Sequence, residues 1–182
     1  MEISTTRLLL RELTPDDAAG LRALDGDPAV TRWLSNDVLT AEESRAYLVG
    51  TIVQGEMTPR LVWELAVIER ASGQLIGRVG LKQQSDPRDA AIWYVFRRDR
   101  WGHGFAQEAI RVLVDFGFRE LALHRVWADI DPENGPSQKL CERLGMRREA
   151  HHEENVFLKG EWRGTIIFAV LAREWRELAQ AK

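Results

Sequence analysis

A loop with two glycines and three arginines lies near the middle of the chain. Gly102 and Gly104 come just before a strongly amphipathic stretch, and Arg97, Arg98 and Arg100 precede them. The first backbone N–H groups of a helix have no partner inside the helix and carry partial positive charge. Glycine has no Cβ, so an anion can approach its backbone closely and φ can become positive. These residues therefore predict a binding site for a phosphate or diphosphate group.

The common nucleotide-binding motifs fit this loop poorly. A Walker loop requires Gly-Lys-Ser/Thr at the start of the helix, but Phe105 and Ala106 follow Gly104 here. A dinucleotide-binding loop has a third glycine at the position that Gln107 occupies. The segment is also consistent with a simple tight turn between a strand and a helix. Taken alone, it does not decide between that turn and a phosphate site.

A second group of residues that could take part in binding or catalysis follows about thirty positions later. Residues 134–137 read Asn-Gly-Pro-Ser, and residues 142–146 read Glu-Arg-Leu-Gly-Met. By residue type and position, Asn134 is typical of a helix N-cap and Ser137 of its partner in the first turn. On these grounds alone, capping is the favoured interpretation of both side chains.

The hydrophobic periodicity and the turn signals predict the elements that position these two groups. Strands are expected near residues 7–13, 61–69, 75–81, 91–96, 126–130, 147–158 and 163–171. Helices are expected to begin after Thr14 and Thr40, to span 105–119, and to follow Asn134, with Gly145 just beyond the last one. This order predicts an α/β fold with a single mixed, mostly antiparallel sheet of about seven strands and flanking helices.

Composition narrows the functional classes. The 182 residues suit a single domain over 1–182, large enough to fold without a disulfide or a metal. A net charge of −3 argues against a nucleic-acid partner. No apolar stretch approaches the roughly 20 residues of a membrane span, and the N-terminus does not resemble a signal peptide. We therefore expect a cytoplasmic protein with no membrane partner.

Metal binding is not expected either. The chain has one cysteine, Cys141, which lies on an apolar stripe and is interpreted as a small core residue. His151 and His152 are neighbours on a predicted strand, where adjacent side chains point to opposite faces. A polar strand flank therefore explains them better than a metal site, although Glu153 or Glu154 beside them could serve as a base.

Taken together, the two groups of residues resemble a known superfamily. Gly-x-Gly-x-Ala at a helix start, followed by Asn-x-x-Ser-(x4)-Glu-Arg-x-Gly-Met, resembles the GNAT acyltransferases over about residues 75–172. The chain is most similar to the ribosomal-protein-alanine N-acetyltransferase branch, which typically has Tyr-Trp-Gly-Lys-Gly-Tyr-Ala where residues 100–106 read Arg-Trp-Gly-His-Gly-Phe-Ala. The chain departs from the superfamily at Asp99, where a basic residue or Gln is common, and at Ala91, where many members have Glu.

The resemblance implies an N-acetyltransferase that moves an acetyl group from acetyl-CoA to a primary amine without a metal. The pantetheine arm would pair with the backbone of Val95 and Phe96, and Arg97 and Arg98 would face the cofactor. The diphosphate would bind the segment Arg100, Trp101, Gly102, His103, Gly104, Phe105 and Ala106. Ser137 would donate a proton to the departing CoA thiolate, and Asn134 would contact the cofactor. The resemblance also admits a homodimer.

The acceptor amine is the open question. A lysine amine is about 0.04% neutral at pH 7, whereas an α-amine is about 10–20% neutral and needs a much weaker base. Because Ala91 removes a familiar candidate base, a protein N-terminus is the first-choice acceptor. A small amine such as a polyamine or an aminoglycoside stays open, as does an acyl-CoA-binding module without catalysis. Trp33 either packs against other side chains or lines the acceptor cleft, and acidic residues lie near it in the sequence. Those neighbours, Asp25, Asp27 and Asp37, would either attract a cationic amine in that cleft or form a solvated loop.

Overall fold

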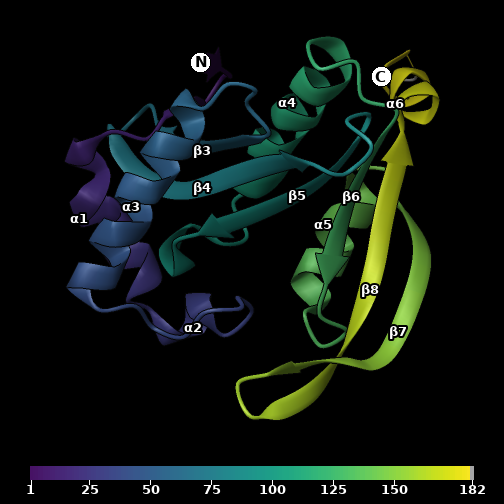
Figure 1. Cartoon of the computed structure of the whole chain (residues 1–182). Helices are drawn as coiled ribbons and strands as arrows, with labels where there is room; N and C mark the ends of the chain where they lie inside the picture. The colour runs from purple at the N-terminus through teal and green to yellow at the C-terminus, as the bar shows by residue number, and fades with distance from the viewer. Residues whose placement is uncertain (181–182) are drawn as a thin grey trace. The chain divides into compact units, whose positions relative to one another are not determined.

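The computed structural model describes residues 1–180 and contains one mixed sheet of eight strands (Figure 1). The strands are β1 (Glu2–Ser4), β2 (Leu8–Glu12), β3 (Val62–Glu69), β4 (Gln74–Gln83), β5 (Asp89–Phe96), β6 (Arg125–Ile130), β7 (Arg147–Leu158) and β8 (Glu161–Leu171). Their order in the sheet is β1-β2-β3-β4-β5-β6-β8-β7. Parallel pairing joins β5 to β6, and antiparallel pairing joins β1 to β2, β2 to β3, β3 to β4, β6 to β8 and β8 to β7. The predicted mixed, mostly antiparallel α/β fold is confirmed.

The helices follow the predicted order with additions. They are η1 (Pro15–Asp17), α1 (Ala18–Asp25), α2 (Pro28–Thr31), α3 (Ala41–Glu56), η2 (Arg98–Arg100), α4 (Phe105–Arg119), α5 (Gly135–Arg143) and α6 (Ala172–Gln180), where η denotes a 3-10 helix. None of the helices within residues 1–180 is both long enough and apolar enough to cross a membrane.

Three elements differ from the sequence prediction. The sheet has eight strands rather than seven because β1 adds a short strand at its edge. The single turn α2 begins at Pro28, within the segment Asp25-Gly26-Asp27-Pro28 that is expected to end the first helix. Asp27 accepts a hydrogen bond from the Ala29 N–H, and Pro28 occupies the first position. The helix α6 starts directly after β8, and the Trp175 Nε1 donates to Asp115 at 2.5 Å.

The chain divides into two compact units. The first unit contains residues 1–82 and 93–113, and the second contains residues 83–92 and those from Val114 onward. Strand β5 and helix α4 each contribute residues to both units. The expectation of one domain over the whole chain stays a prediction.

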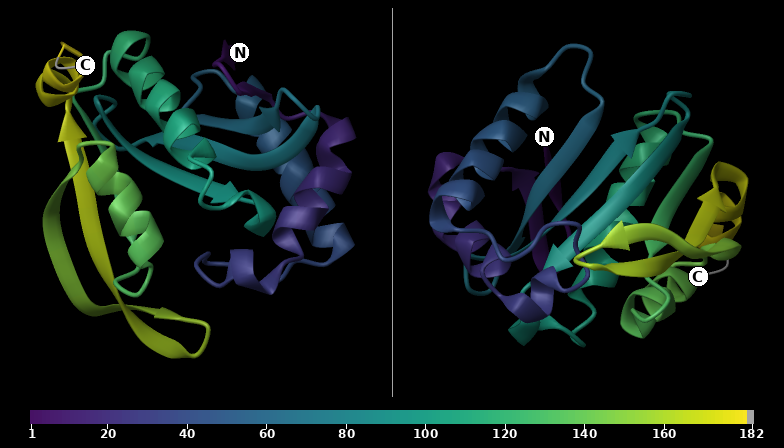
Figure 2. Two further views of the ribbon diagram at one scale, coloured as in Figure 1. Left: turned by 180° about the vertical axis from the view of Figure 1, so that it is seen from behind. Right: turned by 60° about the horizontal axis from the view of Figure 1, so that its bottom comes forward.

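In the first unit, helices cover both faces of the sheet. Helix α3 lies beside α1 and packs on β3, while the first half of α4 lies on the other face (Figures 1 and 2). Local capping fixes two helix starts as the sequence predicts, since Thr14 with Asp17 and Thr40 with Glu43 form capping boxes. The apolar core under α1 and α3 consists of Leu13, Leu21, Leu24, Val30, Leu48, Ala66, Ile68, Leu75 and Val95.

Two glycines on β4 allow β5 to pack closely on it. An ideal Cβ on Gly80 would lie 2.0 Å from Trp93 Cζ2, so the indole ring rests directly on the Gly80 backbone. An ideal Cβ on Gly77 would lie 2.5 Å from the Val95 carbonyl oxygen. The Val95 carbonyl therefore faces β4. Trp93, one of the seven tryptophans, thus packs at a position where only glycine fits on the neighbouring strand.

The second unit is built around β6, β8 and β7. The parallel pairing of β5 with β6 joins Asp89 to Arg125, Ala90 to Val126 and Ala91 to Trp127. Helix α5 ends as predicted, with Gly145 just past it in the left-handed region (φ +84°). Strands β7 and β8 form a long hairpin.

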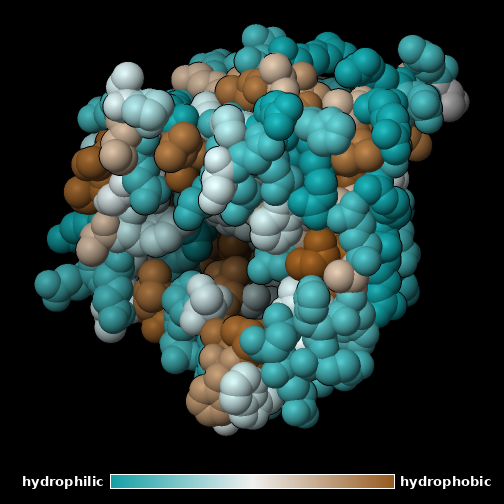
Figure 3. All heavy atoms as spheres, turned by 45° about the vertical axis from the view of Figure 1, so that its right-hand side comes forward, coloured by the Kyte–Doolittle hydropathy of each residue, from teal (hydrophilic) through white to brown (hydrophobic). Residues whose placement is uncertain are grey.

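Most of the surface drawn in Figure 3 is hydrophilic, with small hydrophobic patches. In the second unit, two exposed aromatic side chains, Phe157 and Trp162, lie on the β7–β8 hairpin. They pack edge to face, with their ring centroids 5.5 Å apart. They do not belong to the groups of residues that the sequence singled out for chemistry.

Candidate cofactor-binding site

The loop between β5 and α4 has the backbone geometry that the two glycines predict. Gly102 and Gly104 have φ values of +77° and +78°, which L side chains rarely adopt. The Glu108 N–H donates to the Gly104 carbonyl at 3.1 Å, so Gly104 is the N-cap of α4. A glycine has no side chain with which to cap a helix. The first amides of α4 therefore form a start of the kind that binds anions.

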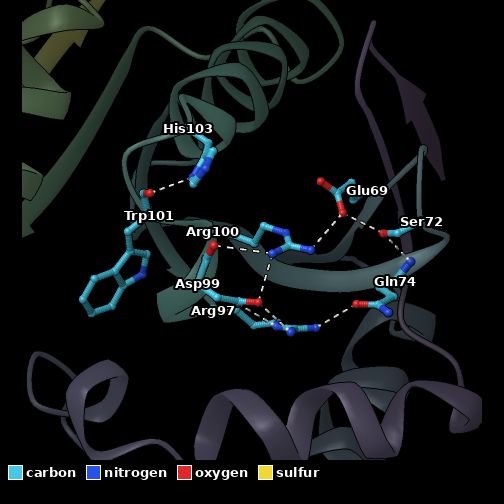
Figure 4. Close-up of polar contacts among 8 residues, drawn as sticks. All are labelled: Glu69, Ser72, Gln74, Arg97, Asp99, Arg100, Trp101 and His103. Atoms are coloured by element: carbon cyan, nitrogen blue, oxygen red, sulfur yellow. Dashed lines mark hydrogen bonds and ion pairs between the residues drawn. The ribbon is translucent and has the colours of Figure 1, made fainter.

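Two of the three arginines of this loop are held in ion pairs (Figure 4). Arg97 donates to both Asp99 carboxylate oxygens, at 3.1 and 2.9 Å, and to Gln74 Oε1 at 3.1 Å. Arg100 donates to Asp99 Oδ2 at 2.9 Å and to Glu69 Oε2 at 3.3 Å. The sequence predicted three cations directed at a phosphate. In the structure, the charges of Arg97 and Arg100 are balanced by two carboxylates.

Hydrogen bonds in this network favour the ionised form of both carboxylates. Hydrogen bonds from Arg97 are the largest influence on Asp99, and they lower the pKa of its carboxyl. For Glu69, the Ser72 hydroxyl is the largest influence; together with Arg100 it lowers the pKa of that carboxyl too. The network ties η2 to the β3–β4 hairpin, which carries Glu69 and Ser72.

The third arginine differs from the other two. The Arg98 side chain is exposed. It lines a surface hollow of about 610 Å³ in the first unit, together with Ala23, Asp27, Arg97 and Asp99. Within this loop, Arg98 is therefore the arginine best placed to meet a ligand from solvent.

Trp101 and His103 complete the loop. The Trp101 Nε1 donates to the Phe96 carbonyl oxygen at 2.8 Å, which folds the loop back onto the end of β5. His103 Nδ1 lies 2.8 Å from the Trp101 carbonyl oxygen, and its ring stacks near Phe105 with the centroids 6.1 Å apart. The structure thus brings the predicted residues from Val95 to Ala106 together in one unit.

Sequence reasoning missed a residue that supports this loop. Arg7, in the turn between β1 and β2, donates to the His103 carbonyl at 2.9 Å and to Glu108 at 2.6 Å. Burial works against ionisation of Glu108, but hydrogen bonds from Thr5 and Arg7 outweigh it and lower the pKa of this carboxyl. No local pattern could reveal the contact, because Arg7 and Glu108 are 101 positions apart.

Asn134 and Ser137 lie in the second unit at the start of α5. The Asn134 side chain accepts a hydrogen bond from the Ser137 N–H at 3.2 Å, so the N-cap that the residue types indicate is present. Both residues are half-buried. Within residues 1–180, Ser137 Oγ has no hydrogen-bond partner. Their catalytic and cofactor-binding roles stay predictions.

The acidic residues near Trp33 do not form an open cluster. Asp25 is fully buried and pairs with Arg78 at 3.1 Å, so its expected place in a solvated loop or an acceptor cleft is wrong. Asp27 caps α2 with its side chain. The Trp33 ring itself lies against Arg32, with the guanidinium carbon 4.6 Å from its centroid.

Asp25 belongs to a buried polar network that the sequence did not reveal. Arg78 on β4 lies between Asp25 and Glu64 on β3, donating to each at 3.1 Å. Tyr47 on α3 donates to Glu64 at 2.6 Å, and Ser44 donates to Asp25 at 3.0 Å. Burial of Tyr47 raises the pKa of its hydroxyl. A signal was present, since Glu64 and Arg78 interrupt otherwise apolar strands, but their partners are not adjacent in sequence.

The remaining candidates have simple structural roles. Cys141 is fully buried, as its apolar stripe predicts. His151 Nδ1 lies 3.7 Å from Glu153, a weak ion pair at most. Within residues 1–180, no group of three His, Cys, Asp or Glu side chains is arranged to hold a metal ion.

Comparison with known proteins identifies the family. Residues 7–147 match the acetyltransferase (GNAT) domain. The chain belongs to this family. A curated relative, the uncharacterized N-acetyltransferase YnaD of Bacillus subtilis, is 30% identical over 175 residues, covering 96% of this chain and 99% of the relative. The protein is therefore an acetyl-CoA-dependent N-acetyltransferase.

Solved structures share the fold of this GNAT acetyltransferase. A GNAT-family acetyltransferase from Bacillus anthracis has a TM-score of 0.85 and 26% identity, covering 95% of this chain and 99% of that one. The ribosomal-protein-S5-alanine acetyltransferase of Vibrio fischeri has a TM-score of 0.80 at 19% identity, with coverages of 96% and 98%. The spermidine N-acetyltransferase of Vibrio cholerae, in complex with CoA and spermine, has a TM-score of 0.81 at 21% identity, with coverages of 94% and 99%.

Proposed function

We propose that this GNAT acetyltransferase acetylates the N-terminal α-amine of a protein. The observation that carries the proposal is Ala91, whose methyl side chain occupies a position of β5 where many members of the family have a Glu. An α-amine is about 10–20% neutral at pH 7 and can react with a weak base or an ordered water, whereas a lysine-like amine is about 0.04% neutral. The ribosomal-protein-alanine acetyltransferase among the solved structures supports this class of acceptor.

In this proposal acetyl-CoA binds along the end of β5 and the start of α4. The diphosphate accepts hydrogen bonds from the amides of residues 102–106, because the amides of Arg100 and Trp101 already donate to the Arg97 and Arg98 carbonyls. Arg98 adds a cation at the surface. The pantetheine arm pairs with the end of β5 through the Phe96 N–H. The Val95 carbonyl faces Gly77, and the Phe96 carbonyl accepts from Trp101, so the Phe96 N–H is the group that remains for a ligand.

The reaction is a direct transfer. The amine nitrogen attacks the thioester carbonyl carbon, and the developing oxyanion is stabilised by a backbone N–H of β5. The C–S bond then breaks, and Ser137 donates a proton to the CoA thiolate. The ammonium proton leaves to water, and water returns a proton to the Ser137 oxygen, so the enzyme ends in its starting state. Asn134 holds the first turn of α5 and contacts the cofactor. The products are the N-acetyl amine and free CoA.

The acceptor experiment compares amines of different pKa with one thiol-release assay. The purified protein is incubated with acetyl-CoA and one acceptor at a time: a peptide with a free N-terminal alanine, the same peptide with a blocked N-terminus and a free lysine, spermidine, and an aminoglycoside. Turnover with the free N-terminus, at least tenfold above the others at pH 7, supports the proposal. A preference for spermidine or the aminoglycoside overturns it in favour of a small-molecule acetyltransferase.

A binding measurement serves as the control for the acceptor assay. CoA binding without thiol release for every acceptor would indicate an acyl-CoA-binding module. Two further parts of the proposal, that the protein acts in the cytoplasm and that it forms a homodimer, have experiments of their own. Cell fractionation followed by immunoblotting locates it, and size-exclusion chromatography with light scattering gives its mass in solution.

A further inference from the structure

One guanidinium group connects the turn between β1 and β2 to the start of α4. Arg7 donates from Nη1 to the His103 carbonyl oxygen at 2.9 Å and from Nε to Glu108 Oε2 at 2.6 Å. Its guanidinium carbon lies 4.5 Å from the centroid of the Phe105 ring. Glu108 also accepts from the Arg7 backbone N–H at 3.0 Å and from the Thr5 hydroxyl at 2.6 Å. Arg7 therefore contacts residues on both sides of the N-cap.

These contacts restrain a segment that would otherwise be free to move. Glycines at 102 and 104 give the backbone many accessible conformations, and ordering such a segment costs conformational entropy. An ideal Cβ on Gly104 would lie 3.4 Å from Arg7 Nη2, so the guanidinium lies directly against the N-cap backbone. A loop that is ordered before its ligand arrives removes that ordering cost from binding.

Arg7 also cancels a charge that opposes the ligand. Glu108 lies in the first turn of α4, close to the amides that would receive an anion. An unpaired carboxylate at this point would repel a phosphate group, and the repulsion grows as water is excluded. The short ion pair between Arg7 and Glu108 neutralises that carboxylate.

We propose that Arg7 is a positioning residue for the diphosphate of CoA. It holds residues 103–105 so that the first amides of α4 point toward the phosphates, and it neutralises Glu108 beside them. The inference rests on the proposed binding of acetyl-CoA at this loop. Arg7 acts through His103 and Glu108 and takes no part in the acetyl transfer itself.

The test compares two ligands that differ in the diphosphate. CoA binding is measured by titration calorimetry, and binding of pantetheine, which has no diphosphate, is measured by ligand-observed NMR. We expect Arg7→Ala to raise the Kd of CoA about tenfold, the equivalent of roughly one lost charge-assisted hydrogen bond. The Kd of pantetheine should be unchanged. General damage to the fold would instead weaken both ligands.

Two variants serve as controls. Arg70, in the turn between β3 and β4, donates to the Thr5 carbonyl oxygen at 2.8 Å. Its side chain has no hydrogen bond to residues 102–106. Arg70→Ala therefore removes an equal charge that contacts the same N-terminal segment. It should leave the Kd of CoA within about twofold. Arg7→Lys keeps the charge but cannot contact His103 and Glu108 with one planar fork. In this variant the Kd of CoA should stay at least threefold above that of the unaltered protein.

Each outcome decides the inference. Unchanged CoA binding in Arg7→Ala, equal weakening of CoA and pantetheine, or an equal loss in Arg70→Ala would overturn it. Full recovery in Arg7→Lys would also overturn it, because charge alone would then be sufficient. If the unaltered protein bound CoA no better than pantetheine, the proposed cofactor site itself would be wrong, and the role of Arg7 would fall with it.

Discussion

Asp99 binds the Arg97 guanidinium through both of its carboxylate oxygens, at 3.1 and 2.9 Å, only two residues along the chain. The same carboxylate accepts from Arg100. At the position where the superfamily often has a basic residue, this chain has an acid that balances its neighbours. In the proposed cofactor site, binding of the diphosphate should therefore depend more on directed backbone amides than on net charge.

Removing the Asp99 charge should strengthen electrostatic attraction to CoA. In Asp99→Asn the two guanidinium groups lose a counter-ion, and we expect the Kd of CoA to fall about threefold at low salt. The gain should vanish near 0.5 M salt, where the screening length is only about 4 Å. Calorimetric titrations at two salt concentrations measure this. Asp86, which binds Arg88 two residues away in the second unit, offers a matched control, and Asp86→Asn should change nothing. Weaker binding in Asp99→Asn would mean that Asp99 mainly orders the loop.

Ser137→Ala should slow turnover without weakening acetyl-CoA binding. Loss of a general acid typically costs about 10²-fold or more in rate, although CoA thiolate is a good leaving group and the effect here should lie near the lower end. Steady-state kinetics with a fixed acceptor measure kcat, and calorimetry measures binding. Ser85→Ala, at an exposed position of the second unit, is the control. Unchanged turnover with intact binding would remove Ser137 from the mechanism.

Arg78→Met should destabilise the first unit strongly. The side chains of Arg78, Asp25 and Glu64 are all under 5% exposed, so removing the guanidinium leaves two buried carboxylates without a cation. Breaking such a pair costs about 3–5 kcal/mol. Urea unfolding measures the loss, and Arg88→Met at an exposed site should change stability by less than about 0.5 kcal/mol. A cost below about 1 kcal/mol would show that the network contributes little to stability.

Stability should fall in acid partly because of Asp17. Burial opposes the ionisation of Asp17, but the bidentate pair with Arg11 and the Thr14 N–H outweigh it and lower the pKa of its carboxyl. A lowered pKa stabilises the fold above the unfolded value of about 3.9, and this stabilisation is lost as the pH falls through the folded value. Asp17→Asn should cost about 1–3 kcal/mol at pH 7 and show a shallower decline below pH 4. Parallel acid titrations of both proteins, followed by circular dichroism, would contradict this if the two curves had the same shape.

Local signals made much of the fold predictable. Thr40 and Asn134 begin their helices by capping amides only three residues away, and Gly145 ends α5 through its own backbone freedom. The loop at Gly102 and Gly104 was recognisable because positive φ depends on residue type. In each case the residues that determine the structure are neighbours in the chain, so spacing alone contains the information.

Contacts between distant segments were not predictable in the same way. Arg7 reaches His103 across 96 positions, and Arg78 reaches Asp25 across 53. A single sequence can show that a polar residue interrupts an apolar strand, but it does not identify the distant partner. Asp25 was therefore misinterpreted as a residue near the acceptor. For the same reason, the sequence did not reveal that Arg97 and Arg100 are held in a network of ion pairs. Glu69, which completes this network, comes from another strand.

The complete burial of Cys141 makes the protein convenient to assay. It is the only cysteine in the sequence, and its side chain is 0% exposed. A disulfide reagent reacts only with thiols that it can reach. The native enzyme should therefore add almost no background when the release of CoA thiol is measured by the absorbance of such a reagent. The same reagent would report the moment at which α5 comes away from the core. One solution can therefore record both product formation and the loss of the fold that makes it.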